Sequence, residues 1–481
     1  MYPLRISSRA KRVYSVPVTI PWIELLGRRG RGSRAIAEAL RAAVESGALP
    51  PGERLPTHRE LARLLGVSVG TVTRAYAAAA ARHVVSGEVG RGTFVRVPEV
   101  GSSLRSRLLD AAPAQVDLGL NLPSHLPEID DPAVARALEH LGPTGVARLL
   151  ATPWSRVEAR QREVGRRWLA RAGLSPVDPE RVLFATGFHT ALQATLRALT
   201  RPGEAVLCEA LTYPGLKRIA SSLHLRLVGV DVDDDGLRPD ALERALRSTG
   251  ARVVHLRPTL STVHAASVPP TRRRELADLA RRRDLVLVEE DEMFPLLDEP
   301  LVPLAALAPE RTVLVADVTR ATLVGVRLAY VLAPEPHLAA LEDALHHEVW
   351  MPSPLLAELL AHWTEDGSLD ELIAARRRDL DARSGLAREL LAAHTPRCPP
   401  RSTCAWLTLP KGHRADAFTL AARAQGIELF PADLFHVPGA ATAPAAVRLS
   451  LTGPSSHADL RVGLSGIAAL AGAGRVRRVL S

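Results

Sequence analysis

Residues 50–76 read PPGERLPTHRELARLLGVSVGTVTRAY, and this stretch decides the fold of the amino-terminal part of the chain. Thr57 and Glu60 have the T-x-x-E spacing of a capping box, which begins a helix. Leucines follow on one face of that helix, which ends at Gly66. Ser68 is a suitable cap for the next helix after a tight turn. Two short helices joined by a turn that contains glycine predict a helix-turn-helix.

The segments on either side extend this unit. A helix is expected to begin at Ser33, because apolar residues recur with helical spacing from Ile36 to Val44. Downstream, residues 84–85 and 93–95 predict two strands around a glycine-rich turn. Three helices followed by such a hairpin predict a winged helix-turn-helix.

Residues 50–95, from PPGERL to GRGTFV, resemble the winged helix of the GntR family of bacterial transcription factors. The resemblance implies that a helix-start arginine contacts phosphate and that the second helix and the wing approach base edges. The implied DNA-binding residues are Arg59, Ser68, Val69, Gly70, Thr71, Thr73, Arg74, Arg91 and Gly92. The alternative for Arg59 and Arg74 is a solvated surface charge. Val69 replaces the polar residue or arginine often found there, so it contacts either a thymine methyl group or no base.

The charge distribution agrees with DNA binding. The chain has 481 residues and a formal net charge of +9. Residues 1–98 contain 16 Arg or Lys, six Glu and no Asp, whereas the remainder contains 45 basic and 46 acidic residues. A basic module on a neutral body is the pattern of a polyanion-binding protein. A solvated basic tail is the alternative reading.

Composition excludes several classes of protein. Hydrophobic residues make up 47% and charged residues 23% of the chain, which excludes whole-chain disorder and collagen-like repeats. The three cysteines (Cys208, Cys398 and Cys404) are too few for a disulfide scaffold and are expected to be buried thiols. There is no signal-peptide core and no apolar run of about 18 residues. We therefore expect a cytoplasmic protein without a membrane partner.

Beyond residue 117 the sequence alternates short apolar runs with helical stretches. This alternation predicts an α/β fold with a mainly parallel sheet covered on both faces. The expected strands are residues 181–184, 205–208, 226–230, 252–256, 285–288, 312–316 and 329–332. A small α+β unit is expected after Pro352, with strands near 403–409 and 446–451. The expected domains are a basic extension (1–20), the winged helix (21–98), a linker (99–116), a large domain (117–352) and a small carboxyl-terminal subdomain (353–481).

Residues 117–475 resemble the fold-type-I aminotransferases, which use pyridoxal phosphate (PLP). The resemblance is carried by residues 185–189 (ATGFH), 211–215 (LTYPG), 258–259 (PT), 325–330 (GVRLAY) and 447–450 (VRLS). A GntR winged helix joined to an aminotransferase-like domain is the architecture of the MocR subfamily. That resemblance implies a homodimer that binds DNA, PLP and a small effector.

The position of the Schiff-base lysine is changed. The resemblance places this lysine seven residues before Arg327, where the sequence has Arg320. A guanidinium stays protonated and cannot form the Schiff base with the cofactor aldehyde. The chain has three lysines, Lys11, Lys217 and Lys411, and neither Lys217 nor Lys411 lies in a segment that could supply the amine.

Other positions of the implied cofactor site are also changed. Asp317 replaces a phosphate-binding hydroxyl, Phe188 replaces a small residue, and Thr262 begins the loop that replaces Asn-Pro-x-Gly. Glu290 stands where an acid meets the pyridine nitrogen, and Met293 where a tyrosine is usual. Together these changes indicate a dismantled cofactor site, so no cofactor is predicted and PLP is not expected to bind covalently.

The same positions define a candidate effector pocket. Its residues are Gly187, Phe188, His189, Tyr213, Thr262, Glu290, Asp317, Arg320, Arg327 and Arg448. Arg327 and Arg448 either bind a small anion or zwitterion, or pair with carboxylates such as Asp317, Glu290 and Asp291. Arg320 is expected to pair with Asp317 or Glu290. His189, His264 and the acidic run 289–292 lack metal-ligand spacing, so no metal site is predicted.

The sequence therefore predicts a sequence-specific bacterial transcriptional regulator and not an enzyme. The aminotransferase-like domain is expected to form a homodimer and to be the candidate sensor of a small effector. Two alternatives stay open. One is an active PLP-dependent aminotransferase fused to a DNA-binding domain, and the other is a ligand-independent dimeric DNA-binding protein.

Overall fold

The computed structural model describes residues 32–472, apart from 46–48, 50–54, 82–83, 89–91, 96–114, 411–412 and 441–442. The chain divides into two compact units, Met1–Arg105 and Ser106–Ser481. The expected basic extension 1–20 lies outside the described residues, and the finer domain boundaries stay predictions.

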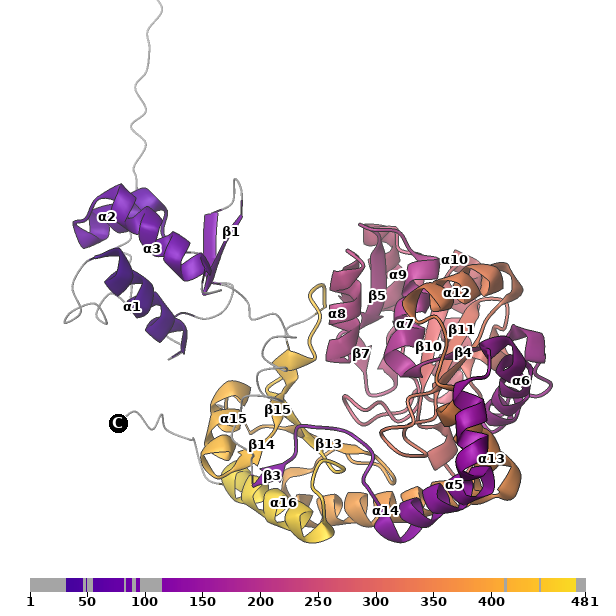
Figure 1. The fold of residues 1–481 in the computed structure, drawn as a ribbon. Helices are drawn as coiled ribbons and strands as arrows, with labels where there is room; N and C mark the ends of the chain where they lie inside the picture. Colours follow the sequence, from indigo (N-terminus) through magenta and orange to yellow (C-terminus); the bar gives the residue numbers. More distant parts are fainter. Residues whose placement is uncertain are drawn as a thin grey trace, which may run out of the picture. The chain divides into compact units, whose positions relative to one another are not determined.

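The first unit has the predicted helix-turn-helix and wing (Figure 1). Its elements are α1 (Ser33–Glu45), α2 (His58–Leu65), α3 (Val69–Ala81), β1 (Val85–Glu88) and β2 (Gly92–Val95). The capping box of α2 has both expected hydrogen bonds: the Glu60 N–H donates to Thr57 Oγ1 at 3.3 Å, and the Thr57 N–H donates to Glu60 Oε2 at 2.8 Å. Gly66 ends α2 with a φ of 64°, which a residue with a side chain rarely adopts. Leu40, Leu61 and Val72 lie in the small apolar core of the unit.

The second unit contains a seven-stranded sheet with the order β4-β12-β11-β10-β9-β5-β6. The strands are β4 (Val182–Ala185), β5 (Ala205–Glu209), β6 (Arg226–Val230), β9 (Val253–Leu256), β10 (Val286–Asp291), β11 (Thr312–Asp317) and β12 (Ala329–Leu332). All seven predicted strands are present. The sheet is parallel except for β12, which is antiparallel to both of its neighbours.

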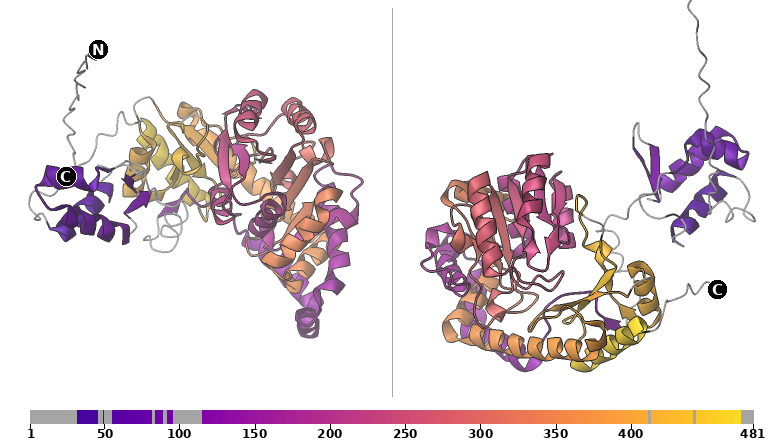
Figure 2. Two further views of the ribbon diagram at one scale, coloured as in Figure 1. Left: turned by 90° about the horizontal axis from the view of Figure 1, so that it is seen from above. Right: turned by 180° about the vertical axis from the view of Figure 1, so that it is seen from behind.

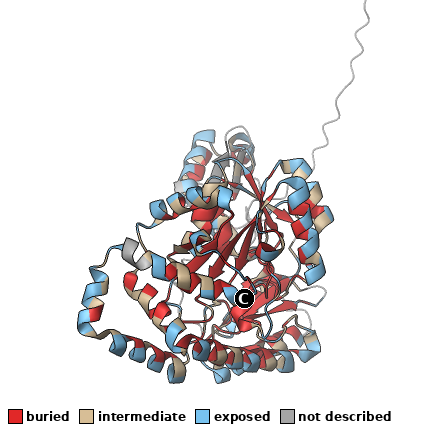
Figure 3. Cartoon of the chain, turned by 90° about the vertical axis from the view of Figure 1, so that its right-hand side faces the viewer, coloured by how far each residue is buried: buried red, intermediate tan, exposed pale blue. Residues whose placement is uncertain are grey.

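Helices cover both faces of this sheet. Alternate strand residues such as Val206, Val288 and Val315 pack with α7 (Gly187–Leu199), α8 (Pro214–Ser222) and α12 (Glu335–Glu348). Residues of opposite orientation pack with a second set of helices: α6 (Trp154–Ala170), α9 (Pro239–Thr249), α10 (Pro270–Arg283) and α13 (Pro354–Asp366). Buried residues therefore line the strands while exposed residues mark the outer helix faces (Figure 3).

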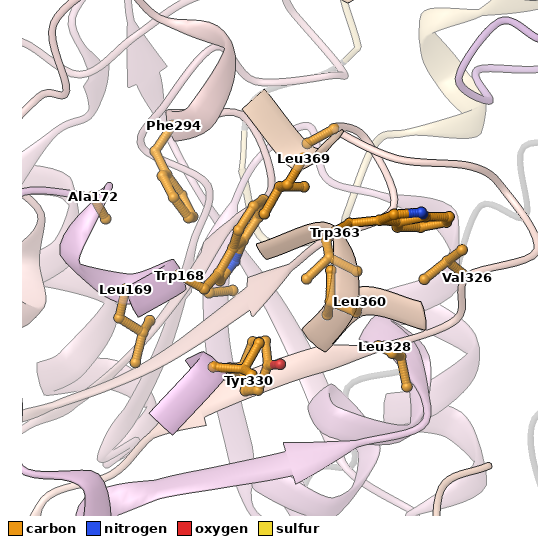
Figure 4. Close-up of a cluster of buried hydrophobic side chains, with 14 of the residues drawn as sticks. Trp168, Leu169, Ala172, Phe294, Val326, Leu328, Tyr330, Leu360, Trp363 and Leu369 are labelled. Atoms are coloured by element: carbon orange, nitrogen blue, oxygen red, sulfur yellow. The ribbon is translucent and has the colours of Figure 1, made fainter. Parts of the chain in front are cut away.

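Large aromatic side chains fill the apolar core beneath α6 and α13 (Figure 4). The rings of Trp168 and Phe294 meet edge to face at 5.2 Å. The indole N–H of Trp363 donates to the carbonyl of Ala133 at 3.0 Å, so its buried donor is satisfied. A Cβ at Gly165 would lie 2.4 Å from the ring of Tyr330, which belongs to β12. Only glycine at this position permits α6 to approach β12 so closely.

The small subdomain is joined to the sheet domain by α14 (Ser368–Leu390), a long helix that runs along one side of the unit (Figures 1 and 2). Its three-stranded sheet has the order β13-β16-β15, where β13 is Cys404–Thr408, β15 is Phe430–Pro431 and β16 is Ala446–Ser450. Helices α15 (Ala415–Ala424) and α16 (His457–Gly472) pack into the same core. The strand that opens the unit, β3 (Val116–Asp117), pairs in parallel with β14 (Ile427–Glu428).

Two composition-based expectations concern features outside the site. All three cysteines are buried and free, as expected. Within the described ranges, no helix combines the length and apolar character needed to cross a bilayer.

Candidate functional site

The residues implied in DNA binding lie at the start of α2 and along α3. Arg59, Val69, Gly70 and Arg74 are exposed, and Thr71 is half-buried. Neither arginine side chain has an ion-pair partner among the described residues, so both cations are available to a phosphate group. Arg91 lies outside the described residues, and Gly92 is the first residue of β2.

The hydroxyl groups at the start of α3 bond to one another and to the helix. Ser68 Oγ and Thr71 Oγ1 share a hydrogen bond of 2.9 Å, and the Thr71 N–H donates to Ser68 Oγ at 3.1 Å. The Thr73 hydroxyl donates to the carbonyl of Val69 at 3.0 Å. The bond from the Thr71 N–H satisfies one of the backbone donors that lack a partner in the first turn of the helix.

The aminotransferase-like site forms at the carboxyl ends of the parallel strands, where open α/β sheets place ligands. Glu290 is the last residue but one of β10, Asp317 is the last residue of β11, and Tyr213 follows β5. Gly187 begins α7 after β4, and Arg448 projects from β16 in the small subdomain. The two subdomains of the second unit therefore both contribute to this site.

Asp317 lies at the amino terminus of α7. Its Oδ2 accepts the N–H of Phe188 at 3.0 Å, and its Oδ1 accepts the N–H of Thr319 at 2.5 Å. Burial raises the pKa of the Asp317 carboxyl to about 6, and the charge of Glu292 acts in the same direction. A protein carboxylate thus interacts with the positive end of the helix dipole.

Four charged side chains form an ion-pair chain, Glu290–Arg257–Glu292–Arg320. Arg257 Nη2 lies 2.9 Å from Glu290 Oε1 and 2.6 Å from Glu292 Oε1. Arg320 Nε donates to Glu292 Oε2 at 3.0 Å. The second oxygen of Glu290 lies 3.0 Å from His255 Nε2. Two cations and two carboxylates therefore compensate one another away from water.

The prediction that Arg320 pairs with Asp317 or Glu290 was wrong. Arg320 pairs with Glu292, and its Nη1 also donates to Asn121 Oδ1 at 3.2 Å. Asp317 is occupied by backbone N–H groups, and Glu290 is occupied by Arg257. Asn121 continues the network into the small subdomain, because its Oδ1 accepts the hydroxyl of Thr452 at 3.0 Å.

Aromatic side chains lie beside the ion-pair chain. The Tyr213 hydroxyl and His189 Nε2 are 2.9 Å apart, and the rings of Tyr213 and Phe188 are 6.0 Å apart. The Arg257 guanidinium lies 5.7 Å from the centre of the Tyr213 ring, within the range of a cation–π contact.

Arg448 is buried without a carboxylate partner among the described residues. Its guanidinium lies 4.8 Å from the centre of the Phe435 ring and donates to the carbonyl groups of Thr262 (3.4 Å) and Gly119. Its Nε is buried and has no hydrogen-bond acceptor in the described part of the chain. Burial lowers the pKa of Arg448 to about 10. The alternative that Arg448 pairs with Asp317, Glu290 or Asp291 is therefore wrong.

Arg327 differs from Arg448 because its side chain is exposed. It has no ion-pair partner among the described residues, so pairing with the same carboxylates is wrong for Arg327 as well. Its backbone packs against the start of α7: a Cβ at Gly187 would lie 3.4 Å from the Arg327 carbonyl carbon.

The sequence interpretation missed two members of the ion-pair chain, Arg257 and Glu292. Arg257 directly follows the predicted strand 252–256, and Glu292 belongs to the acidic run that was considered only for metal binding. Met293, placed at the tyrosine position, instead lies in an apolar cluster with Leu260 and Leu296. Among the described residues, no cluster of His, Cys, Asp and Glu is arranged to hold a metal ion.

Lys217 is the lysine that falls within the described ranges. Its Nζ donates to the carbonyl groups of Leu434, at 2.8 Å, and His436. Burial lowers its pKa to about 8. Lys11 and Lys411 lie outside the described residues.

Comparison with known proteins agrees with this two-unit architecture. Residues 33–95 match the family described as bacterial regulatory proteins, gntR family, and residues 113–467 match aminotransferase class I and II. The chain belongs to the aminotransferase class I and II family and, with its GntR domain, to the MocR-like regulators. Proteins with the aminotransferase fold of this family normally bind PLP.

Several relatives of this MocR-like protein are named as regulators. The HTH-type transcriptional regulator YdeF of Bacillus subtilis is 29% identical, over 90% of this chain and 92% of its own. The pyridoxine biosynthesis transcriptional regulator PdxR of Corynebacterium glutamicum is 28% identical, over 74% of this chain and 78% of its own. The HTH-type transcriptional regulator TauR of Rhodobacter capsulatus is 27% identical, over 86% of this chain and 91% of its own.

Solved aminotransferases have the same fold as the second unit of this MocR-like protein. The kynurenine aminotransferase of Pyrococcus horikoshii superposes with a TM-score of 0.68 at 21% identity, over 78% of this chain and 94% of the enzyme. An archaeal alanine:glyoxylate aminotransferase gives a TM-score of 0.67 at 20% identity, over 78% of this chain and 96% of the enzyme. At these identities the likeness shows the fold alone.

Proposed function

We propose that this MocR-like protein is a transcriptional regulator whose winged helix binds operator DNA and whose aminotransferase-like domain dimerises and senses a small molecule without catalysis. The observation that carries the proposal is Arg320, which is held by Glu292 and Asn121 at the position where the resemblance places the lysine. A guanidinium at this position cannot form a Schiff base. Such a regulator acts in the cytoplasm, on the nucleoid.

The residues present do not fit PLP. Asp317 already accepts the Phe188 N–H at the amino terminus of α7, where a phosphate group would otherwise bind. A phosphate at that helix terminus would meet a buried carboxyl group. Glu290 is committed to Arg257 and His255, so it is not available to a pyridine nitrogen.

Arg448 supports a sensing role. The Arg448 guanidinium is buried and faces aromatic rings and carbonyl groups; within the described part of the chain it has no charge partner and its Nε lacks an acceptor. The carboxylate of a small anion or zwitterion would supply both the opposite charge and the hydrogen-bond acceptor. We therefore propose an effector of this class, with Arg448 as its main contact.

One observation favours a second candidate function. The ion-pair chain satisfies Arg257 and Arg320 without a ligand. The site could then be a closed structural element of a DNA-binding protein that needs no effector.

The cofactor part of the proposal is tested by absorbance spectroscopy of the full-length protein mixed with PLP. We expect no internal-aldimine band at about 420 nm and no cofactor fixed to the chain by borohydride. A band that borohydride fixes covalently would overturn this part and support an active aminotransferase.

The sensing part is tested by thermal unfolding in the presence of amino acids and small carboxylic acids. A carboxylate that raises the melting temperature of the native chain should fail to do so for Arg448→Gln. Arg397→Gln is the matched control, because Arg397 is a partly exposed arginine that pairs with Asp234 at the surface. If no ligand of a broad panel stabilises the native chain, the ligand-independent alternative is favoured.

The dimer part is tested by light scattering. We expect twice the mass of the chain both for the full-length protein and for a chain lacking residues 1–98, because the large second unit supplies the interface. A monomer at micromolar concentration for the chain lacking residues 1–98 would refute it.

A further inference from the structure

We propose that α3 recognises thymine methyl groups through an apolar reading patch, which consists of Val69 and the methyl group of Thr73. The operator half-site would then carry thymine at the two positions that these side chains face. This inference rests on the proposed DNA binding and adds the chemistry by which the base sequence is read.

Val69 is an exposed apolar side chain at the first position of α3. Its exposed fraction is 44%, whereas Val72 and Tyr76, further along the same helix, are buried in the core of the unit, to which Val69 does not belong. Val69 therefore contributes little to the packing of the winged helix. In a helix-turn-helix, the amino-terminal residues of the second helix are those that contact base edges in the major groove.

Thr73 lies one helical turn after Val69 and is also exposed. Its hydroxyl donates to the carbonyl of Val69 at 3.0 Å, so the hydrogen of that hydroxyl is used within the helix. The methyl group is the other branch of this side chain. An exposed threonine whose hydroxyl is bonded to its own helix presents mainly this methyl group to a partner.

The backbone beside this patch leaves room for a base to approach closely. Gly70 lies between Val69 and Thr71, and the nearest atom to a Cβ built there is Ser68 Oγ at 3.8 Å, so the backbone is open on this side. The hydroxyls of Ser68 and Thr71 bond to each other. The thymine C5-methyl is the apolar group that base pairs present in the major groove. The patch therefore matches thymine better than guanine or cytosine.

The test begins with selection of high-affinity duplexes from random DNA by the full-length protein. Each thymine of the selected half-site is then replaced by uracil, which removes the methyl group and leaves base pairing unchanged. Loss of one buried methyl contact should weaken binding about fourfold. We expect this loss at two positions of the half-site. Pairing 5-methylcytosine with guanine at these positions should restore part of the affinity lost on changing thymine to cytosine.

Two conservative variants assign each position. Val69→Ala should abolish the uracil effect at one position. Thr73→Ser, which keeps the hydroxyl bond and removes only the methyl group, should abolish it at the other. Leu64→Ala is the matched control: Leu64 is 42% exposed on α2, and its variant should retain both uracil effects.

The outcomes separate this inference from the proposed function. Tight binding of a selected duplex with equal affinity for thymine and uracil would overturn the inference alone. Retention of both uracil effects in Val69→Ala and Thr73→Ser would also overturn it. If no duplex is selected, the proposed DNA binding itself fails and the inference fails with it.

Discussion

The carboxylate of Asp317 accepts the backbone N–H of Phe188 at 3.0 Å, in the first turn of α7. Asp317 is the last residue of β11. In the sheet, β12 lies between β11 and β4, and β4 is the strand that leads into α7. The amino terminus of a helix attracts anions because its first N–H groups lack partners within the helix. In this protein the chain supplies the anion itself.

Stability should depend on pH through Asp317. Its pKa is about 6 in the folded protein and 3.8 in a model compound, so the folded state binds more protons between these values. The contribution of Asp317 to the free energy of unfolding is therefore present at low pH and decreases as pH rises. Relative to Asp317→Asn, we expect the native chain to lose about 1.3 kcal/mol between pH 5 and pH 7. Urea unfolding at several pH values measures this difference, and a native chain that becomes more stable relative to Asp317→Asn as pH rises would contradict the assignment.

Arg320→Lys should not create an aminotransferase. The new amine would still face Glu292, and Asp317 would still occupy the start of α7. We expect no transamination of a panel of amino acids and no borohydride-fixed cofactor. The double variant Arg320→Lys, Asp317→Ser is the informative comparison, because it also removes the carboxylate. Activity in the single variant would show that Asp317 does not obstruct the cofactor.

Arg257 should be important for stability. Arg257→Met would leave the buried carboxylates of Glu290 and Glu292 without their shared cation, at a cost of about 3–5 kcal/mol in the free energy of unfolding. Adding Glu290→Gln should recover part of the loss. Arg244→Met is the control: Arg244 pairs with Asp240 at the surface, and its loss should change stability by less than about 1 kcal/mol. Equal effects of the two arginine variants in chemical denaturation would contradict the role of Arg257.

Arg59→Ala should weaken binding to selected and random duplexes by the same factor. A phosphate contact carries no base information, and its loss should reduce the slope of log K against log salt by about 0.9. Arg34→Ala is the control, because Arg34 already pairs with Glu38 on α1. Binding measured from low to moderate salt decides the matter, and an unchanged slope would place Arg59 away from the phosphates.

Features created by interactions between residues close together in the sequence could be predicted, whereas those created by residues far apart in the sequence could not. The capping box of Thr57 and Glu60 and the apolar runs of the strands are local, and both were predicted correctly. The partners of Arg320 are Glu292 and Asn121, which are 28 and 199 residues away along the chain. Strand order and side-chain reach decide such pairs, and a single sequence does not specify them. Charge alone therefore suggested Asp317 or Glu290 for Arg320, and Arg257 was overlooked because no resemblance marked it.

The segment that follows β3 is held by two arginines of the site, one from each subdomain of the second unit. The Gly119 carbonyl accepts from Arg448, and the Asn121 side chain accepts from Arg320. A molecule that drew either guanidinium toward itself would remove one of these hydrogen bonds from the segment next to β3. Occupancy of the site would then be transmitted to β3, the strand that opens the second unit and pairs with β14.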